Sequence, residues 1–82
     1  MITVKYRGVL AELTGKLQEQ IDAATVNDVM KYVKKTYSAA AYKEAKKLLI
    51  VINGDSILLH KGFKTPTSDG DTVSFLPVCG GG

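Results

Sequence analysis

The last three residues of the 82-residue chain are glycines, Gly80, Gly81 and Gly82. Because glycine lacks Cβ, such a segment is narrow and adopts backbone conformations that are closed to other residues. The stretch from Pro77 to Gly82 would reach about 20 Å when extended, so it can enter a channel in another protein and present its carboxylate there. A tail without any role is the alternative. Against it, the glycines closely follow an expected strand, and Pro77, which has no N–H, marks where sheet pairing ends.

A terminal carboxylate must be activated before it can react with a nucleophile, because its negative charge makes it a poor electrophile. Attack of the carboxylate on the α-phosphate of ATP gives an acyl-adenylate, from which a persulfide can displace AMP and leave a thiocarboxylate. The sequence has neither a Gly-Lys-Ser/Thr phosphate-binding loop nor a nucleophile paired with a base. We therefore expect a carrier that does no catalysis and a separate adenylating enzyme.

The residues just before the glycines have candidate roles in binding a partner. Leu76 and Val78 share the outward face of the last expected strand. They form an apolar docking patch for the activating enzyme, or a face that neighbouring loops partly cover. Cys79 is either an accessible thiol without a role, or a nucleophile that captures the activated terminus or forms a disulfide with a partner.

The remaining residues with reactive side chains have structural explanations. His60 is the only histidine, and we find no Cys, Asp or Glu at metal-ligand spacing from it, so we expect a histidine on the surface or one whose hydrogen bonds are satisfied, and not a metal ligand. Asp69 and Asp71 flank a glycine in a predicted turn, and the sequence implies no pocket in which they would act as paired carboxylates. We therefore expect neither a metal site nor a catalytic site in this chain.

Composition limits the class of protein and its partners. Apolar residues make up 45% of the chain, which suits one compact domain. The single cysteine, Cys79, excludes an internal disulfide framework and indicates the reducing cytoplasm. The longest apolar stretch, Leu48 to Ile52, is too short to cross a bilayer. The net charge of +3 comes with scattered lysines and without arginine–aromatic clusters, so nucleic acid is not the expected partner.

Two alternating segments near the start of the chain, residues 2–7 and 17–22, predict strands. The inward residues are Ile2, Val4 and Tyr6 in the first segment, and Leu17, Glu19 and Ile21 in the second. Glu19 breaks the apolar pattern, which an edge strand tolerates. Between the two segments, Leu10 and Leu13 indicate a short helical turn or a loop held against the core.

An amphipathic helix is expected to begin after Thr25, whose side chain can cap the free N–H groups, with Asp28 in the first turn. Its apolar stripe consists of Val26, Val29, Met30, Val33 and Tyr37. Residues 39–47 have high helix propensity. They either extend this helix beyond a break near Ser38 or form a second helix.

The second half of the chain predicts further strands. The apolar run from Leu48 to Ile52 is typical of a strand covered on both faces. Asn53-Gly54 predicts a hairpin that leads into residues 56–59, and residues 62–68 form a loop. The last strand is expected from Thr72 to about Val78. Two strands, one amphipathic helix and then more strands indicate an α+β roll with the helix across one sheet face.

The segment DGDTVSFLPVCGGG, from Asp69 to Gly82, resembles the C-terminal signature of the ubiquitin-like sulfur carriers. This family includes the small subunit of molybdopterin synthase (MoaD type) and the thiamine carrier (ThiS type). The opening ITVKYRGVLAELTG, with its Glu12-Leu13 pair, and the middle segment LLIVINGDSI resemble the MoaD type, as does the length. The chain departs from that type at Cys79-Gly80, where Val-Thr is frequent, and at Leu76, where Phe is frequent.

This resemblance implies a β-grasp fold, with a mixed sheet of four or five strands and one main helix across one face. The first and last strands would lie parallel at the sheet centre. Residues 1–76 would form the domain and residues 77–82 a flexible tail. Gly82 would be adenylated and thiocarboxylated, and Leu76 would help to dock the partner. The residues inserted into that partner would be Pro77, Val78, Cys79, Gly80 and Gly81.

The resemblance also implies the partners. A ubiquitin-activating-type adenylyltransferase would use ATP and Mg²⁺, while the carrier itself would hold no cofactor. A sulfurtransferase or another persulfide donor would supply the sulfur, and the large subunit of molybdopterin synthase would receive the tail. Three alternatives remain open. In the first, the chain is a protein modifier that is joined to lysines through Gly82. In the second, it carries sulfur for tRNA thiolation or thiamine synthesis. In the third, it is an adaptor without tail chemistry.

Overall fold

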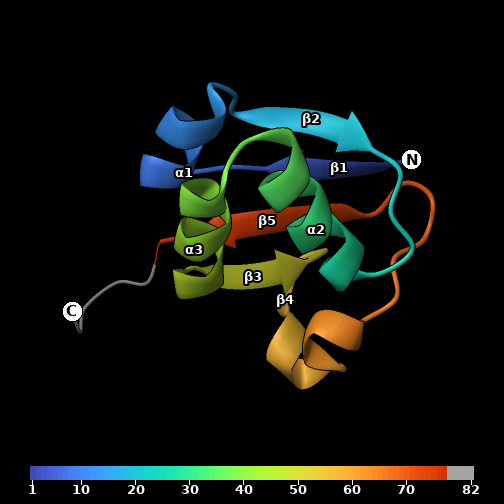
Figure 1. Ribbon diagram of the computed structural model, residues 1–82. Coiled ribbons are helices and arrows are strands. Elements are labelled where there is room, and N and C mark those ends of the chain that lie inside the picture. Colours follow the sequence, from blue (N-terminus) through green and yellow to red (C-terminus); the bar gives the residue numbers. More distant parts are fainter. Residues whose placement is uncertain (78–82) are drawn as a thin grey trace.

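The computed structural model describes residues 1–77, and residues 78–82 lie outside the described part of the chain. Figure 1 shows its strands and helices. The elements are β1 (Ile2–Lys5), α1 (Gly8–Thr14), β2 (Gln18–Ile21), α2 (Val26–Thr36), α3 (Ala39–Lys47), β3 (Leu49–Ile52), β4 (Asp55–Ser56), the short 3₁₀ helices η1 (Ile57–Leu59) and η2 (Gly62–Lys64), and β5 (Thr72–Leu76).

The five strands form one mixed sheet in the order β2-β1-β5-β3-β4. The central strand β5 runs parallel to β1, with Val4 opposite Val73, and antiparallel to β3, with Ile50 opposite Phe75. Figure 1 shows α2 and α3 lying across one face of this sheet. This arrangement is the β-grasp fold, so the predicted fold class and the parallel pairing of the first and last strands are confirmed.

The core fills the space between that sheet face and the helices. Alternate residues of β1 and β5 point into it, and Phe75 and Tyr6 stack with their ring centroids 6.0 Å apart. The buried apolar residues include Ile2, Val4, Tyr6, Leu10, Val26, Val29, Met30, Val33, Ala41, Ala45, Val73 and Phe75. Within residues 1–77, none of the helices has the length and hydropathy needed to cross a membrane.

The cap predicted from Thr25 at the start of α2 is confirmed, and Asp28 completes a capping box. Thr25 Oγ1 accepts a hydrogen bond from the Asp28 amide at 3.2 Å, and Asp28 Oδ2 accepts one from the Thr25 amide at 3.2 Å. The helix α3 is separate from α2 because Ser38 adopts an extended conformation and caps the new helix, accepting from the Ala41 amide at 3.0 Å. Residues 39–47 are therefore a second helix packed against the first.

Three details of the predicted strands are wrong. Leu17 does not point inward; it is 72% exposed and precedes β2, which begins at Gln18. The strand β3 is not covered on both faces, since Leu49 is 39% exposed and Val51 is half-buried. The hairpin at Asn53-Gly54 forms, with positive φ angles at both residues, but β4 is only two residues long. The chain then turns into η1, where Ser56 Oγ accepts from the Leu58 amide at 3.2 Å.

Glu19, the residue that breaks the pattern of β2, is the centre of a hydrogen-bonded cluster. Its carboxylate accepts from the hydroxyls of Tyr6 at 2.6 Å, Tyr32 at 2.8 Å and Tyr37, and from Lys16 Nζ at 3.3 Å. Burial raises the pKa of this carboxyl, but the tyrosine and lysine hydrogen bonds outweigh burial and hold its pKa below the ordinary value. Burial and the nearby carboxylate raise the pKa of Tyr6 and of Tyr37, which stay neutral donors. The cluster joins the edge strand β2 to α2.

Candidate functional site at the end of β5

The predicted site begins where β5 ends. Leu76 is the last residue of β5, and Pro77, which follows it, is exposed and is the last residue that the structure describes. The other predicted site residues, Val78, Cys79, Gly80, Gly81 and Gly82, lie outside the described residues. Their predicted roles, like the division into a domain at 1–76 and a tail at 77–82, stay predictions.

Leu76 lies on the sheet face that the helices leave open. Its neighbour Phe75 points into the core, so Leu76 points the other way, where it is half-buried. It pairs directly with Leu49 of β3, and the next pair on this face is Ser74 with Val51. Side chains directly opposite in a sheet contact each other, so Leu76, Leu49 and Val51 form an apolar patch at the base of the tail.

Pro77 lies beside the start of α1. Because β1 and β5 are parallel, both strands end at the same edge of the sheet, where the chain leaves β1 through Arg7 and Gly8. Gly8 has a φ of +58°, and a Cβ added there would lie 3.8 Å from Pro77 Cγ. A contact at that distance is an ordinary one, so the positive φ at the start of α1, and not a lack of space, is what favours glycine here.

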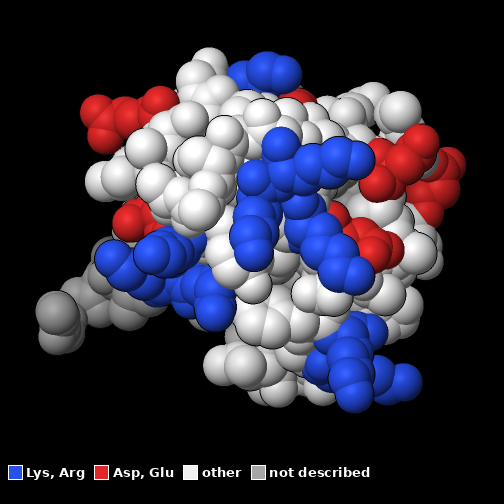
Figure 2. Space-filling view, in the orientation of Figure 1, with Lys and Arg blue, Asp and Glu red and all other residues white. Residues whose placement is uncertain are grey.

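The same edge carries positive charge. Lys46 and Lys47 occupy the last turn of α3, directly before the strand that pairs with β5, and Arg7 is exposed at the end of β1. Figure 2 shows basic side chains gathered over the lower end of α3. The base of the tail is therefore an apolar patch beside cations, which favours a partner surface with apolar and acidic groups.

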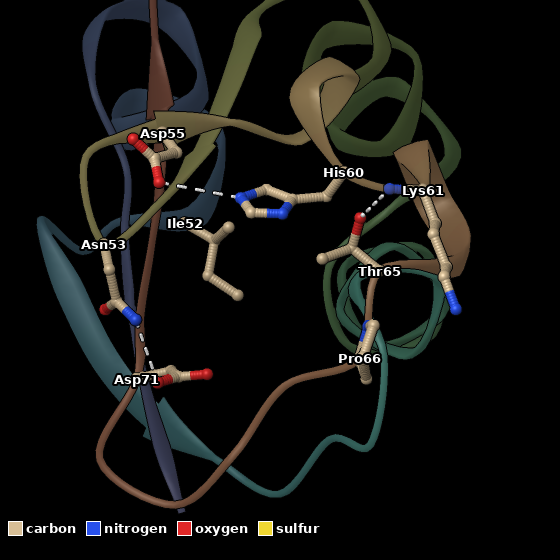
Figure 3. A pocket seen from close by; sticks show the side chains of 8 residues that line it. All are labelled: Ile52, Asn53, Asp55, His60, Lys61, Thr65, Pro66 and Asp71. Atoms are coloured by element: carbon tan, nitrogen blue, oxygen red, sulfur yellow. Dashed lines mark hydrogen bonds and ion pairs between the residues drawn. The ribbon is translucent and has the colours of Figure 1, made fainter.

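A pocket of about 500 Å³ that the sequence did not predict lies at the opposite end of β3 (Figure 3). Its lining includes Asp55 and His60, which face each other with Oδ2 and Nε2 3.7 Å apart, and Asp71. Asp71 accepts from Asn53 Nδ2 at 2.9 Å and from the Ser68 amide at 2.8 Å. These hydrogen bonds lower the pKa of the Asp71 carboxyl, so it is an ionised acceptor and not a proton donor.

This pocket does not join the predicted site. Its lining includes Ile52, at the end of β3, whereas β5 ends at Leu76 beside Leu49, at the start of β3. Leu49 and Ile52 are three residues apart, or about 10 Å along the strand. Asp69 is not part of the lining; it pairs with the N-terminal ammonium of Met1. Among residues 1–77, no three His, Cys, Asp or Glu side chains come together in a way that could hold a metal ion. His60 is on the surface, as the sequence predicts, with a side chain that is 43% exposed.

The sequence of the chain identifies its protein family. The profile of the ThiS family matches residues 4–82, nearly the whole chain and including the three glycines. The chain belongs to the ThiS family. It is a small ubiquitin-like protein of the sulfur-carrier class, and the members of this family are carriers without catalytic activity. No curated protein sequence matches the chain.

Several solved structures have the same fold. CysO in the BexX/CysO complex of Amycolatopsis orientalis is 22% identical, with a TM-score of 0.83 and 100% of each chain covered. Small archaeal modifier protein 1 of Methanosarcina acetivorans is 26% identical, with a TM-score of 0.83, over 99% of this chain and 95% of that one. A Pyrococcus furiosus protein provisionally named molybdopterin converting factor subunit 1 is 22% identical, with a TM-score of 0.70, over 95% and 97%.

Proposed function

We propose that this protein carries sulfur for molybdopterin synthesis as a thiocarboxylate on Gly82. The observation that supports sulfur carriage at Gly82 most directly is the family match, which extends through the glycines at the end of the sequence. The fold adds a physical reason. Gly82 follows the last residue of the central strand β5 by six positions in the chain, and β5 is held on both sides by β1 and β3, so the base of the segment that bears Gly82 is fixed.

The proposed chemistry needs three steps, which begin at the Gly82 carboxylate. In the first, the carboxylate attacks the α-phosphate of ATP in an adenylyltransferase of the ubiquitin-activating type, with Mg²⁺, and pyrophosphate leaves. In the second, the outer sulfur of a persulfide on a sulfurtransferase displaces AMP and forms an acyl disulfide. A second thiol of the donor then cleaves this disulfide, which releases the thiocarboxylate and leaves the donor oxidised.

The residues before Gly82 have proposed roles in presenting it. Leu76, together with Leu49 and Val51, forms the apolar patch that would dock the adenylyltransferase and later the large subunit of molybdopterin synthase. Pro77 would direct the segment away from the sheet, and Val78 to Gly81 would enter the partner. We place the carrier in the cytoplasm, where a lone thiol such as Cys79 stays reduced.

A second candidate is a protein modifier joined to lysines through Gly82. The similarity to small archaeal modifier protein 1, at 26% identity, favours it. Both functions begin with the same adenylate, and they differ in the nucleophile that follows, a persulfide in one case and a lysine amine in the other. The molybdopterin pathway is favoured by the sequence resemblance to the MoaD type.

Mass spectrometry of the intact protein tests both candidates. The purified chain is incubated with cell extract, ATP and a sulfur donor, alongside a variant that lacks Gly82. Exchange of one oxygen for sulfur, absent in the variant, supports carriage, and delivery of this sulfur to a pterin precursor by a molybdopterin synthase large subunit supports the pathway. Conjugates on lysines that disappear with Gly82 support the modifier. If the variant still carries sulfur, the proposed role of Gly82 is wrong.

A further inference from the structure

A second hollow, of about 200 Å³, lies on the surface between the end of α3, the start of β3 and the 3₁₀ helices. We call it the η groove. The residues that line it are Lys46, Leu48, Leu49, Ile50, Ile57, Leu58 and Phe63. All but one are apolar, and its volume leaves room for a single large side chain. The function proposed above makes no use of this groove beyond Leu49.

Three large apolar side chains that line the η groove are exposed to solvent. Leu58 is 81% exposed, Phe63 is 42% exposed and Leu49 is 39% exposed, and all three converge on it. Each exposed side chain of this size forgoes the stabilisation that burial would give it. Single exposed apolar residues are ordinary, but three that line one hollow are typical of a binding surface.

Lysines lie on or near the η groove. Lys46 lines it, and Lys47 follows at the end of α3. Lys61, which lines the larger pocket, and Lys64 stand at the two ends of η2, whose Phe63 lines the groove. In Figure 2 the surface between the basic side chains of α3 and those of the 3₁₀ helices is uncharged. An apolar hollow with Lys46 in its lining and Lys47 beside it in the chain is complementary to an apolar side chain with acidic neighbours.

The η groove lies close to the base of the tail. Leu49 lines it and is also the strand partner of Leu76, the residue before Pro77. We propose that the η groove binds a short acidic segment of the partner protein that holds the C-terminal tail, and that this segment inserts one leucine or phenylalanine between Leu49, Leu58 and Phe63. This binding needs neither ATP nor Gly82, so it can be tested apart from the proposed sulfur chemistry.

Peptide titration tests the proposal on the full chain. The probe is a ten-residue peptide of aspartate and glutamate with one central phenylalanine, and the readout is the shift of backbone amide NMR signals at low salt. We expect shifts concentrated at Leu49, Leu58 and Phe63. A peptide that differs only in having alanine at the central position should bind at least about 10-fold more weakly, because it loses the burial of the aromatic ring.

Matched variants separate the η groove from general charge attraction. Leu58→Ser should weaken binding of the phenylalanine peptide about 10-fold, whereas Leu59→Ser should not, because Leu59 is 76% exposed in the same 3₁₀ helix but does not line the groove. Lys46→Glu should weaken binding more than Lys34→Glu. Both ammonium groups lie over the Tyr42 ring, at 5.4 and 5.2 Å, but only Lys46 lines the groove.

Three outcomes would overturn the proposal: equal binding of the two peptides, equal effects of Leu58→Ser and Leu59→Ser, or shifts confined to the lysines of α2. The sulfur-loading assay with the Leu58→Ser variant distinguishes the two proposals. If the variant loses peptide binding but a high concentration of activating enzyme still converts Gly82, both proposals stand. If peptide binding is intact while Gly82 never exchanges oxygen for sulfur in the native chain, only the sulfur chemistry fails.

Discussion

Replacing Glu19 with glutamine tests whether the tyrosine cluster stabilises the fold through charge. The substitution keeps the size and shape of the side chain but removes its negative charge and exchanges one acceptor oxygen for an NH₂ group. In the native protein one carboxylate oxygen accepts from Tyr6 and Tyr37, and the other accepts from Tyr32 and Lys16. At least one tyrosine hydroxyl would therefore face a donor in the variant, close to a core in which Tyr6 is fully buried.

The expected loss follows from these hydrogen bonds. A bond to a charged acceptor contributes about 1.5–3 kcal/mol, compared with about 1 kcal/mol for a neutral pair, and a buried donor left unpaired costs about 1–3 kcal/mol. With three tyrosine donors involved, we expect the free energy of unfolding to fall by about 2–4 kcal/mol at pH 7. For a domain of this size each kcal/mol lowers Tm by about 4–8 °C.

Urea denaturation followed by circular dichroism measures this loss, and Glu12→Gln on the exposed surface of α1 is the matched control. The pH dependence gives a second readout. The pKa of Glu19 is lower in the folded protein than its ordinary value of 4.5, so its stabilisation is fully present above that value and is lost as pH falls through the folded pKa. The stability difference between the native chain and Glu19→Gln should therefore be constant near neutral pH and shrink below about pH 4.5.

Two results would refute this reasoning. One is a loss below about 0.5 kcal/mol at pH 7, which is the range of ordinary surface substitutions. The other is a large loss that stays constant down to pH 3, which would show that packing, and not the carboxylate charge, accounts for it.

Three further substitutions test single features. Thr25→Ala should cost about 1 kcal/mol in urea denaturation, because the Asp28 amide loses its cap, while Thr25→Ser should retain it. Gly54→Ala should cost about 1–2 kcal/mol, because its φ of +90° strains any residue with a Cβ although nothing lies within 4 Å; an unchanged Tm would contradict this. Leu76→Glu should weaken binding to the adenylyltransferase, measured by titration calorimetry, with a loss of folding stability below about 1 kcal/mol; a strong drop in Tm would show that Leu76 belongs to the core.

Local patterns in the sequence were sufficient to predict the central elements of the fold. The alternation in β1 and β5, the capping box of α2 and the Asn53-Gly54 turn each depend on residues close together in the chain. For residues 39–47, helix propensity alone does not show whether the serine before them interrupts a helix or begins one. In the structure Ser38 does both.

The predictions are wrong or incomplete where burial and contacts depend on residues that are distant in the sequence. Nothing local shows that β3 has helices on only one side, so its apolar run alone predicts a strand buried on both faces. The three tyrosines that bind Glu19 lie 13 to 18 residues away from it, and Asp71 meets Asn53 across the β3–β5 pairing. The site itself could be predicted only from the glycines and the family resemblance, since the apolar patch at Leu76 needs Leu49 beside it.

The position of β5 between two neighbours also determines how the domain responds to mechanical load. A partner that draws on the chain beyond Leu76 pulls β5 along its own axis, against paired residues of β1 on one side and of β3 on the other. Such a load is shared by many hydrogen bonds at once, whereas a strand at the sheet edge can be peeled away one bond at a time. The domain is therefore a firm anchor for traction applied at its C-terminal end.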